Sequence, residues 1–309
     1  MDFPRLSVFL AVARHLSFRR AAAGLHLSQP AVSKHIQHLE AGLGLALFER
    51  RGNRVALTEA GRMLQDYGQR VTMLTDEVRR ALAELQGLQR GALRIGASTT
   101  PGLYLLPERL ARFRREHPSL ETQLVITNSA DIAHRVAGGE LDLGFVGALP
   151  EARGLQVRPF AEDEIVLIAP SRHPAARRAA APAAVLAALA RDTWVMREAG
   201  SGTREVALAG LAEQGITPTR TMELSGCEAV KRAVAAGLGV GFVSRHAVGL
   251  EVEHGLLRIV DDPSLRFRRL LYLVTRKDAR PSPAVLAFTA HVFKHAPSPL
   301  RDSRRDGSG

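Results

Sequence analysis

Apolar residues recur at helical spacing through the first forty positions and predict three short helices. Ser17 and Ser28 stand where the N-caps of the second and third helices are expected, and Pro30 falls in the first turn, where its missing N–H costs little. The second and third helices, joined by a tight turn, predict a helix-turn-helix. The apolar positions of the three helices are Leu6, Phe9, Leu10 and Ala13, then Phe18, Ala21, Ala22 and Leu25, then Val32, Ile36 and Leu39.

The third predicted helix has a hydrophilic face opposite its apolar one. Side chains of these kinds form hydrogen bonds with base edges and phosphates, and a helix-turn-helix presents such a face to the major groove of DNA. An ordinary αα-hairpin with a solvated face is the alternative. The cap, the turn, the polar face and a basic flank occur together, and this combination favours DNA binding. The face consists of Gln29, Ser33, Lys34 and Gln37.

The segment at residues 48–58 predicts a basic β-hairpin, because the pair Gly52-Asn53 is a turn signal between two short runs. Such a wing would place Arg50, Arg51 and Arg54 against the DNA backbone, whereas the alternative is that they only solubilise a loop. Residues 1–58 contain eight Lys or Arg and three Asp or Glu. We therefore expect DNA affinity to fall steeply with salt, because each neutralised phosphate releases counterions.

A helical pattern continues from residue 59 to about residue 90, with apolar positions that alternate spacings of three and four. Such a heptad stripe is typical of a helix that packs along a partner helix, so we predict a linker helix that forms a dimer. Packing on the second domain of the same chain is the alternative. The residues expected at the dimer contact are Leu64, Tyr67, Val71, Leu74, Val78 and Leu85.

From Gly91 onward, predicted strands and helices alternate, which indicates an α/β domain of parallel βαβ units. A further helix is indicated by Leu106, Leu110 and Phe113. Residues 297–309 are rich in Pro, Ser, Arg, Asp and Gly and predict a disordered tail. The expected strands are 93–97, 121–126, 141–146, 165–169, 193–196, 221–224, 240–243 and 270–275, and the expected helices 128–137, 182–189, 202–212, 229–236 and 282–295.

Three strand-to-helix turns in this domain are small and rich in hydroxyl groups, at residues 98–100, 200–204 and 225–228. In the last turn, Ser225 and Glu228 have the spacing of a capping box. Ligands of open α/β sheets bind outside the carboxyl ends of the strands, where helix N-termini present free N–H groups. Each turn alone is explained by helix capping, but three of them together predict a site for a small anion.

Composition narrows the functional classes. The net charge of +11 favours a polyanionic partner, and one cysteine excludes an intramolecular disulfide. No signal peptide and no run of eighteen apolar residues is present, so we expect a cytoplasmic protein without a membrane span. We predict no enzyme, cofactor or metal: Ser201 lacks a nucleophile elbow, and His35 and His38 lack further ligands nearby. Cys227 is expected to be a packed residue, with redox sensing as the alternative.

The chain resembles the LysR-type transcriptional regulators. The resemblance implies a winged helix-turn-helix, a long linker helix and a two-lobed effector domain like type 2 periplasmic binding proteins, with the chain crossing between lobes near residues 161–163 and 266–268. The implied domains are 1–58, 59–90 and 91–296, with lobe I at about 91–161 and 268–296 and lobe II at about 162–267. The likeness is most specific at residues 21–22, 25–33, 36, 39–40, 47–48, 50 and 57–61.

The resemblance also assigns residues to the two binding sites. It implies DNA contacts from Ser28, Pro30, the polar face and the wing. Arg19 stands where a small hydroxyl residue is common, and it would add a phosphate contact. Ser244 stands where a proline often follows the preceding strand, and this departure leaves the structure of the local turn open. Segments 98–100 and 198–204 are similar to members that respond to inorganic sulfur anions or to phosphorylated metabolites of carbon fixation. The implied effector residues are Ser98, Thr99, Thr100, Thr127, Asn128, Ser201, Gly202, Thr203 and Ser225.

These patterns together predict a sequence-specific transcriptional regulator that binds double-stranded DNA as a homodimer or a dimer of dimers. A small anionic effector between the lobes would alter its DNA binding or bending. The alternative is a cytosolic small-molecule binding protein whose basic head docks a protein partner.

Overall fold

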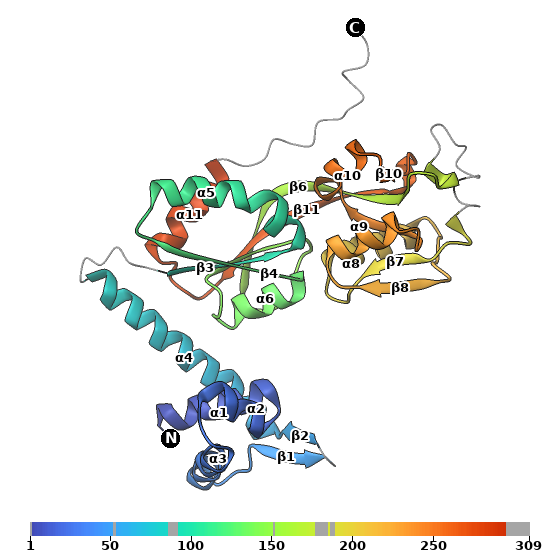
Figure 1. Ribbon diagram of the computed structural model, residues 1–309. Coiled ribbons are helices and arrows are strands. Elements are labelled where there is room, and N and C mark those ends of the chain that lie inside the picture. Colours follow the sequence, from blue (N-terminus) through green and yellow to red (C-terminus); the bar gives the residue numbers. More distant parts are fainter. Residues whose placement is uncertain are drawn as a thin grey trace. The chain divides into compact units, whose positions relative to one another are not determined.

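The computed structural model describes residues 2–51, 54–85, 92–150, 152–176, 185 and 189–294. Contacts divide the chain into two units, residues 1–82 and 83–309, and each has its own hydrophobic core. Figure 1 shows the elements of both units. The predicted tail at 297–309 and most of the predicted helix at 182–189 lie outside the described residues.

The N-terminal unit contains the three predicted short helices, a two-stranded sheet and a long helix (Figure 1). The hydroxyls of Ser17 and Ser28 accept hydrogen bonds from backbone N–H groups three residues further on, which confirms both N-caps. All the apolar positions predicted for the three helices lie in this unit's core or pack against it. The elements are α1 (Phe3–His15), α2 (Phe18–Leu25), α3 (Gln29–Leu43), β1 (Phe48–Arg51), β2 (Arg54–Leu57) and α4 (Glu59–Leu85).

The predicted hairpin forms, since β1 and β2 pair antiparallel with Arg51 opposite Arg54. Glu40, near the end of α3, holds the hairpin in place. Its carboxylate accepts hydrogen bonds from the N–H groups of Leu47 (2.7 Å) and Phe48 (3.3 Å). These bonds connect α3 directly to the first strand of the hairpin.

Helix α4 begins at the predicted position and packs closely on α1. The Thr58 hydroxyl accepts a hydrogen bond from the Gly61 N–H (3.0 Å) and so caps the helix. About two turns after Gly61, a Cβ atom at Gly68 would lie 2.8 Å from a methyl group of Leu6. Only a residue without a side chain lets the two helices approach this closely.

The second unit contains a sheet covered by helices on both faces. Most strands and helices form where the pattern predicts them. Its helices are η1 (Pro101–Leu105), α5 (Leu106–Glu116), α6 (Ser129–Ala137), η2 (Pro174–Ala176), α8 (Gly202–Glu213), α9 (Cys227–Ala235), η3 (Arg245–Ala247), α10 (Gly249–Glu253), η4 (Pro263–Leu265) and α11 (Pro283–Lys294). Its strands are β3 (Ala92–Ser98), β4 (Glu121–Thr127), β5 (Leu143–Val146), β6 (Leu155–Pro170), β7 (Trp194–Arg197), β8 (Thr221–Leu224), β9 (Val240–Ser244), β10 (Leu257–Ile259) and β11 (Arg266–Arg276).

The sheet is mixed, so the prediction of parallel units holds only in part. Its order is β4-β3-β5-β11-β6-β9-β7-β8, with β10 beside β6. The neighbours of β3 and β7 are parallel to them, as predicted. Strands β6 and β11 run antiparallel to each other and to their other neighbours. Both are longer than predicted, because polar residues in the middle of β6 and at the start of β11 interrupt the apolar pattern that marks a buried strand.

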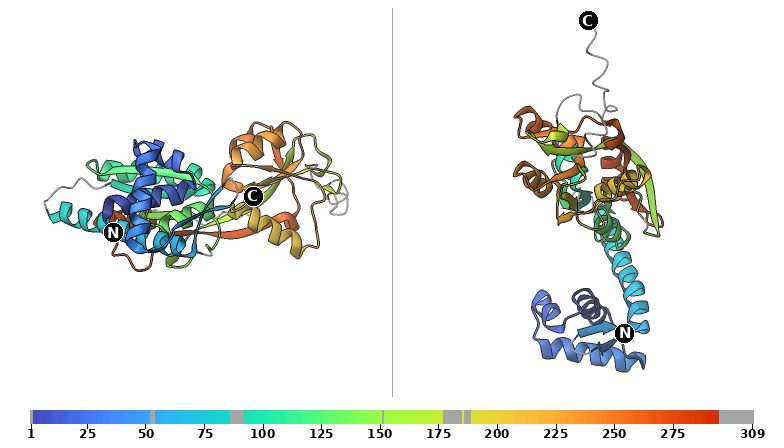
Figure 2. Two further views of the ribbon diagram at one scale, coloured as in Figure 1. Left: turned by 90° about the horizontal axis from the view of Figure 1, so that it is seen from below. Right: turned by 90° about the vertical axis from the view of Figure 1, so that its right-hand side faces the viewer.

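Separate cores define two lobes within this unit, joined by β6 and β11 (Figure 1 and Figure 2). Lobe I is built on β3, β4 and β5, with α5 and α11 on one face and α6 on the other. Lobe II is built on β7, β8 and β9, with α8 and α9 on opposite faces. The two crossing strands change core between Ala161 and Ile165 and between Phe267 and Leu271. We call this part of β6 and β11 the hinge.

Candidate anion pocket and nucleic-acid interface

Helix α3 has the two faces that its sequence predicts. Val32, Ile36 and Leu39 are buried in the core of the N-terminal unit. The opposite face is open to solvent, because no described segment of the unit covers it. Its exposed residues are Ser28, Gln29, Pro30, Lys34 and Gln37, with Ser33 half-buried beside them.

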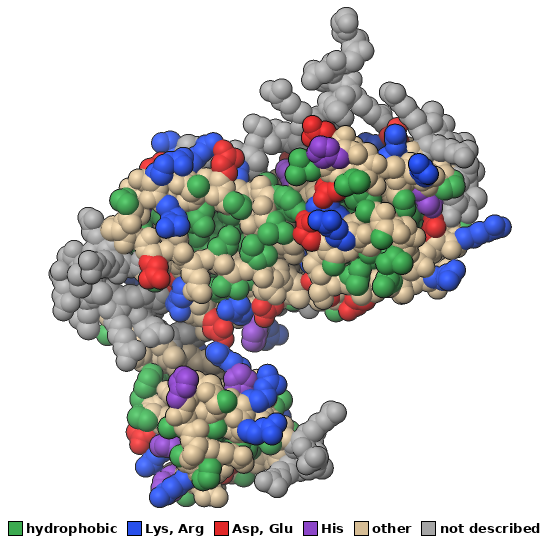
Figure 3. Space-filling model, in the orientation of Figure 1, with side chains coloured by type: hydrophobic (Ala, Val, Ile, Leu, Met, Phe, Trp, Pro, Cys, Tyr) green, Lys and Arg blue, Asp and Glu red, His purple; other side chains and the backbone are tan. Residues whose placement is uncertain are grey.

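The surroundings of α3 are basic. Arg19 and Arg20 are exposed on α2. Figure 3 shows mainly Lys, Arg and His side chains among the charged groups on the visible face of this unit. The backbone of the hairpin carries Arg50, Arg51 and Arg54, but the positions of these side chains and the turn at 52–53 lie outside the described part of the chain.

Helix α4 exposes a stripe of apolar side chains. Tyr67, Val71, Leu74 and Val78 follow heptad spacing and are 55%, 43%, 61% and 51% exposed. Leu64 differs, because it packs against the core of the N-terminal unit and does not belong to the exposed stripe. The side chain of Leu85 lies outside the described set.

In the second unit, most of the predicted effector residues surround one small pocket between the lobes. We call it the anion pocket. Lobe I contributes the end of β3 and the start of α6, and lobe II contributes the end of β7 and the N-terminus of α8. The first N–H groups of a helix have no intrahelical partner and favour an anion. The lining residues are Ser98, Thr99, Thr100, Asn128, Ser129, Arg197, Ser201, Gly202, Thr203 and Arg269.

Arg197 brings a buried positive charge to the pocket from the end of β7. Its guanidinium forms a bidentate pair with Glu198 (both contacts 2.8 Å) and donates a hydrogen bond to the Thr99 hydroxyl of lobe I (3.1 Å). Burial alone would raise the pKa of Glu198, but its hydrogen bonds with Arg197 outweigh that effect and the pKa is lowered. The pair therefore stays ionised, with the cation directed at lobe I.

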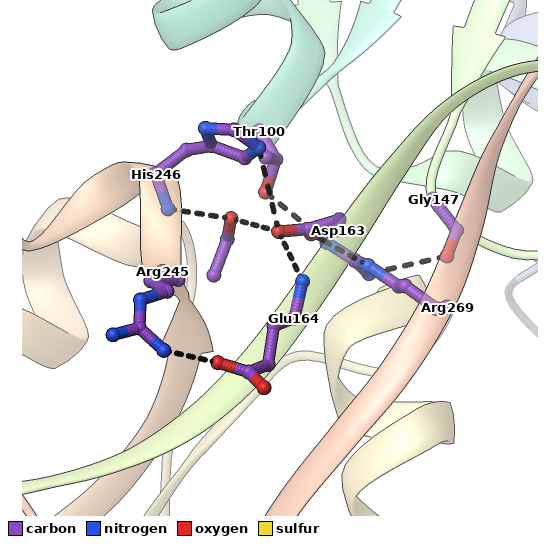
Figure 4. A network of polar contacts seen from close by, with 8 residues as sticks. Thr100, Gly147, Asp163, Glu164, Arg245, His246 and Arg269 are labelled. Carbon is purple, nitrogen blue, oxygen red and sulfur yellow. Dashed lines mark hydrogen bonds and ion pairs between the residues drawn. The ribbon is translucent and has the colours of Figure 1, made fainter. Parts of the chain in front are cut away.

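Arg269 brings a second buried cation from the hinge (Figure 4). It pairs with Asp163 on β6 through Nε (2.8 Å) and a terminal nitrogen (2.7 Å). It also donates hydrogen bonds to two groups of lobe I, the Gly147 carbonyl (3.1 Å) and the Thr100 hydroxyl (3.2 Å). Burial lowers the pKa of Arg269, and the charge of Asp163 offsets part of this shift.

The Asp163 carboxylate also has a hydrogen-bond partner in lobe II. It accepts a hydrogen bond from the Ser244 hydroxyl (2.6 Å), which itself accepts one from the His246 N–H (3.2 Å). Ser244 thus closes the turn after β9, where the resemblance left the local structure open. The network in Figure 4 joins both lobes through the hinge.

The lobes also meet at the rim of the pocket. The Ala130 N–H donates to the Gly200 carbonyl (3.2 Å). A Cβ atom at Gly202 would lie 2.7 Å from the Gly147 carbonyl oxygen, so the start of α8 lies directly against lobe I. The pocket has a volume of about 10 Å³, which is room for about one water molecule. An anion of several atoms therefore enters only when the lobes or the lining side chains move apart.

Tyr104 and Glu228 form a further contact between the lobes. The Tyr104 hydroxyl, in η1, donates a short hydrogen bond to the Glu228 carboxylate at the start of α9. Burial and this bond raise the pKa of Tyr104, so the phenol stays protonated. Burial would raise the pKa of Glu228, but hydrogen bonds from Lys231 and Tyr104 lower it. The contact is therefore a neutral donor on a carboxylate.

This contact replaces the capping box that the sequence predicts. The N-cap of α9 is Gly226, with φ of +83°, and no side chain caps the helix. Ser225 is exposed and does not line the anion pocket, and neither does half-buried Thr127. Cys227 is buried next to Tyr104, and burial raises the pKa of its thiol, as expected of a packed residue.

Sequence reasoning missed three pocket residues, Ser129, Arg197 and Arg269. Ligands of α/β sheets bind at the carboxyl ends of strands. The position of Arg197 at the end of a predicted strand could therefore have identified it as a pocket residue. Arg269 lies among the arginines at the start of β11, and nothing in the local sequence marks it as buried.

The described residues also limit what else this protein could hold or span. No group of three or more His, Cys, Asp and Glu side chains there could hold a metal ion. None of the described helices is both long and apolar enough to cross a membrane.

Comparison with known proteins identifies the family. Residues 3–62 match the bacterial regulatory helix-turn-helix protein model of the lysR family, and residues 86–297 match the LysR substrate binding domain. The second match covers more than half of the chain. The protein belongs to the LysR family of transcriptional regulators and combines a DNA-binding helix-turn-helix with an effector-binding domain.

Individual regulators of this family are similar to the chain over most of their length. The RuBisCO operon transcriptional regulator of Allochromatium vinosum is 40% identical over 292 residues, which span 94% of this chain and 95% of that protein. The regulatory domain of CcmR from Synechocystis PCC6803, solved in complex with 2-PG, is 30% identical with a TM-score of 0.61 and covers 67% of this chain and 97% of that one. The structure of CbnR, a LysR family regulator, is 23% identical with a TM-score of 0.65, covering 96% and 100%, and shows the same fold.

Proposed function

We propose that this LysR-family regulator responds to a small phosphorylated carboxylate bound in the anion pocket. The observation that carries the proposal is the pairing of two buried guanidinium groups, Arg197 and Arg269, with hydroxyls and the N-terminus of α8. Each arginine is already paired with one carboxylate. An added anion is therefore held by hydroxyl and N–H donors as well as by the two guanidinium groups. Inorganic sulfur anions, the other ligand class that the sequence suggests, have fewer hydrogen-bond acceptors to match the donors of this pocket.

The comparisons support the choice of effector and of target. CcmR was solved in complex with 2-PG, and the relative from Allochromatium is named for the RuBisCO operon. We infer that this chain controls genes of the same kind. The protein-docking alternative for the basic head loses its basis, because that head matches a DNA-binding family model.

Effector binding is tested by isothermal titration calorimetry of the full chain with 2-PG, inorganic phosphate and sulfate. The Thr203→Val variant keeps the shape of the pocket but removes one donor to a charged ligand, which is worth roughly 1.5–3 kcal/mol. We expect 2-PG to bind more tightly than either inorganic anion and the variant to lose tenfold or more in affinity. Thr221→Val, on the exposed edge of β8, is the matched control. Equal binding by parent and Thr203→Val would refute the pocket.

We further propose that α3 and the hairpin contact DNA through the residues named for them, including the arginines. In fluorescence anisotropy with DNA from upstream of the RuBisCO genes of the same genome, Lys34→Ala should reduce the salt slope by about 0.9, the value of one phosphate contact. Gln29→Ala should cost about 1–3 kcal/mol and relax specificity. Lys277→Ala, exposed in the second unit, is the control. Unchanged affinity and selectivity in both variants would refute this interface.

The domain plan belongs to the same proposal: a DNA-binding head at 1–58, a linker at 59–90 and an effector domain at 91–296. The exposed stripe on α4 supports pairing of two chains along their linker helices, since apolar groups in heptad spacing pack on a partner helix. Two heads then contact two half-sites. An effector that stabilises one lobe separation changes DNA binding by linkage, with a coupling of about 1–3 kcal/mol being typical.

A further inference from the structure

A second cavity lies along the hinge and is much larger than the anion pocket. Its volume is about 480 Å³, within the range of roughly 300–1,000 Å³ that small-molecule sites occupy. We call it the hinge groove. Both lobes and both crossing strands contribute to its walls. The lining residues are Gly147, Ala148, Leu149, Glu162, Asp163, Glu164, Val206, Arg245, Arg268, Arg269, Leu270 and Tyr272.

The register of the crossing strands determines which charges face this groove. Glu164 lies opposite Arg268, and Glu162 lies opposite Leu270. Side chains alternate between the two faces of a strand, so these four residues share one face and Asp163 and Arg269 lie on the other. Figure 4 shows Asp163 and Arg269 directed into the network between the lobes.

Two opposite charges on the groove face have no ionic partner among the side chains that the structure describes. Glu164 is paired with Arg245. Among the described side chains, neither Glu162 nor Arg268 has a hydrogen bond or an ion pair, and both are exposed. They are diagonal neighbours on antiparallel strands, a relation that places two residues about 7–8 Å apart, with their Cβ atoms somewhat closer. Since the structure shows no ion pair between these two described side chains, a small group can contact both the carboxylate and the guanidinium.

Apolar groups complete the groove. Leu149 and Val206 come from the two lobes, and Leu270 and Tyr272 come from β11. Leu149 and Leu270 are 65% and 40% exposed, so they present free apolar surface to the cavity. The groove therefore combines an apolar wall with one carboxylate and one guanidinium that have no ionic partner among the described side chains.

We propose that the hinge groove binds a zwitterionic amino acid with an apolar side chain. Its ammonium group pairs with Glu162, its carboxylate forms a bidentate pair with Arg268, and its side chain packs on Leu149, Val206 and Leu270. A purely anionic ligand would leave Glu162 repelling it, and a cation would meet Arg268 in the same way. Because the walls belong to different lobes, the bound amino acid favours one lobe separation.

The test is calorimetric titration of the full chain with L-leucine, L-methionine and L-phenylalanine. We expect at least one of them to bind at a single site, and Glu162→Gln and Arg268→Gln each to weaken that binding tenfold or more. N-acetyl-L-phenylalanine lacks the cation and phenethylamine lacks the carboxylate, and both should bind at least tenfold more weakly than the amino acid. Arg258→Gln, exposed on β10, should bind as the parent does.

The Thr203→Val variant separates this site from the anion pocket, because it should lose affinity for 2-PG and retain its affinity for the amino acid. Absence of binding by all three amino acids would overturn the proposal. So would binding that Glu162→Gln and Arg268→Gln leave unchanged, or binding of the two truncated ligands with the affinity of the amino acid.

Discussion

The contribution of the hinge to the free energy of unfolding can be measured through the Asp163–Arg269 pair. The side chains of Asp163 and Arg269 are 0% and 5% exposed. In an Arg269→Met variant the carboxylate keeps hydrogen bonds from Ser244 and from the Glu164 N–H, but it loses its counter-ion. Removal of one partner of a buried pair costs about 3–5 kcal/mol, because the remaining charge stays desolvated.

This magnitude predicts a large thermal shift. For a domain of about 200 residues, 1 kcal/mol corresponds to roughly 2–4 °C in Tm, so Arg269→Met should lower the Tm of the second unit by about 6–20 °C. The double variant Asp163→Leu with Arg269→Met replaces both charges with apolar groups and should recover most of the loss. Circular dichroism melting of the full chain measures both.

The neighbouring arginine provides the control. Arg268 is exposed and has no ionic partner among the described side chains, so Arg268→Met should change stability by no more than about 0.5 kcal/mol. A melting temperature of Arg269→Met within 2 °C of the parent would refute the reasoning. A double variant no more stable than Arg269→Met would also refute it, since the cost would then not come from the unpaired carboxylate.

Three further predictions concern the lobes and the linker. Tyr104→Phe removes the phenolic donor between the lobes, so 2-PG should dissociate several-fold faster in stopped-flow displacement; an unchanged rate would show that this contact does not hold the lobes together. Glu198→Gln should melt below the parent at neutral pH, because the lowered pKa of this carboxyl means that its ionised form stabilises the fold above the ordinary value of 4.5. The difference should shrink as pH falls through the lowered pKa, and a constant difference down to acid would contradict this. Val71→Glu with Leu74→Glu should yield monomers in sedimentation velocity, whereas an unaltered oligomer would exclude the α4 stripe as the contact.

Local patterns predicted the N-terminal unit well, because its structure rests on contacts between residues close in sequence. Ser17 and Ser28 each bond an N–H group three residues away, and those bonds form wherever the helix starts. The same reasoning failed at Ser225 and Glu228. There the carboxylate bonds Tyr104 in the other lobe, more than a hundred residues away, so tertiary contacts overrode the local signal.

Strand β6 of the hinge shows the same limit of prediction from local sequence patterns. Residues 162–164 are polar, and the pattern predicted a strand only from Ile165 onward. In the structure β6 starts at Leu155, because its polar centre pairs with β11 and alternates between a solvent-facing side and the buried Asp163. A strand that passes from one core to another cannot show a continuous apolar face.

The amino-acid sequence alone determined the helix-turn-helix, its polar face, the heptad stripe of α4 and the hydroxyl-rich turns of the second unit. These features depend on periodicity and on capping over three or four residues. The tertiary structure decided that Arg197 and Arg269 lie in one pocket, and that Glu162 and Arg268 face another. Those juxtapositions follow from strand order and register, which bring together residues as far as 169 positions apart, as in the hydrogen bond from Arg269 to Thr100. No local pattern carries that information.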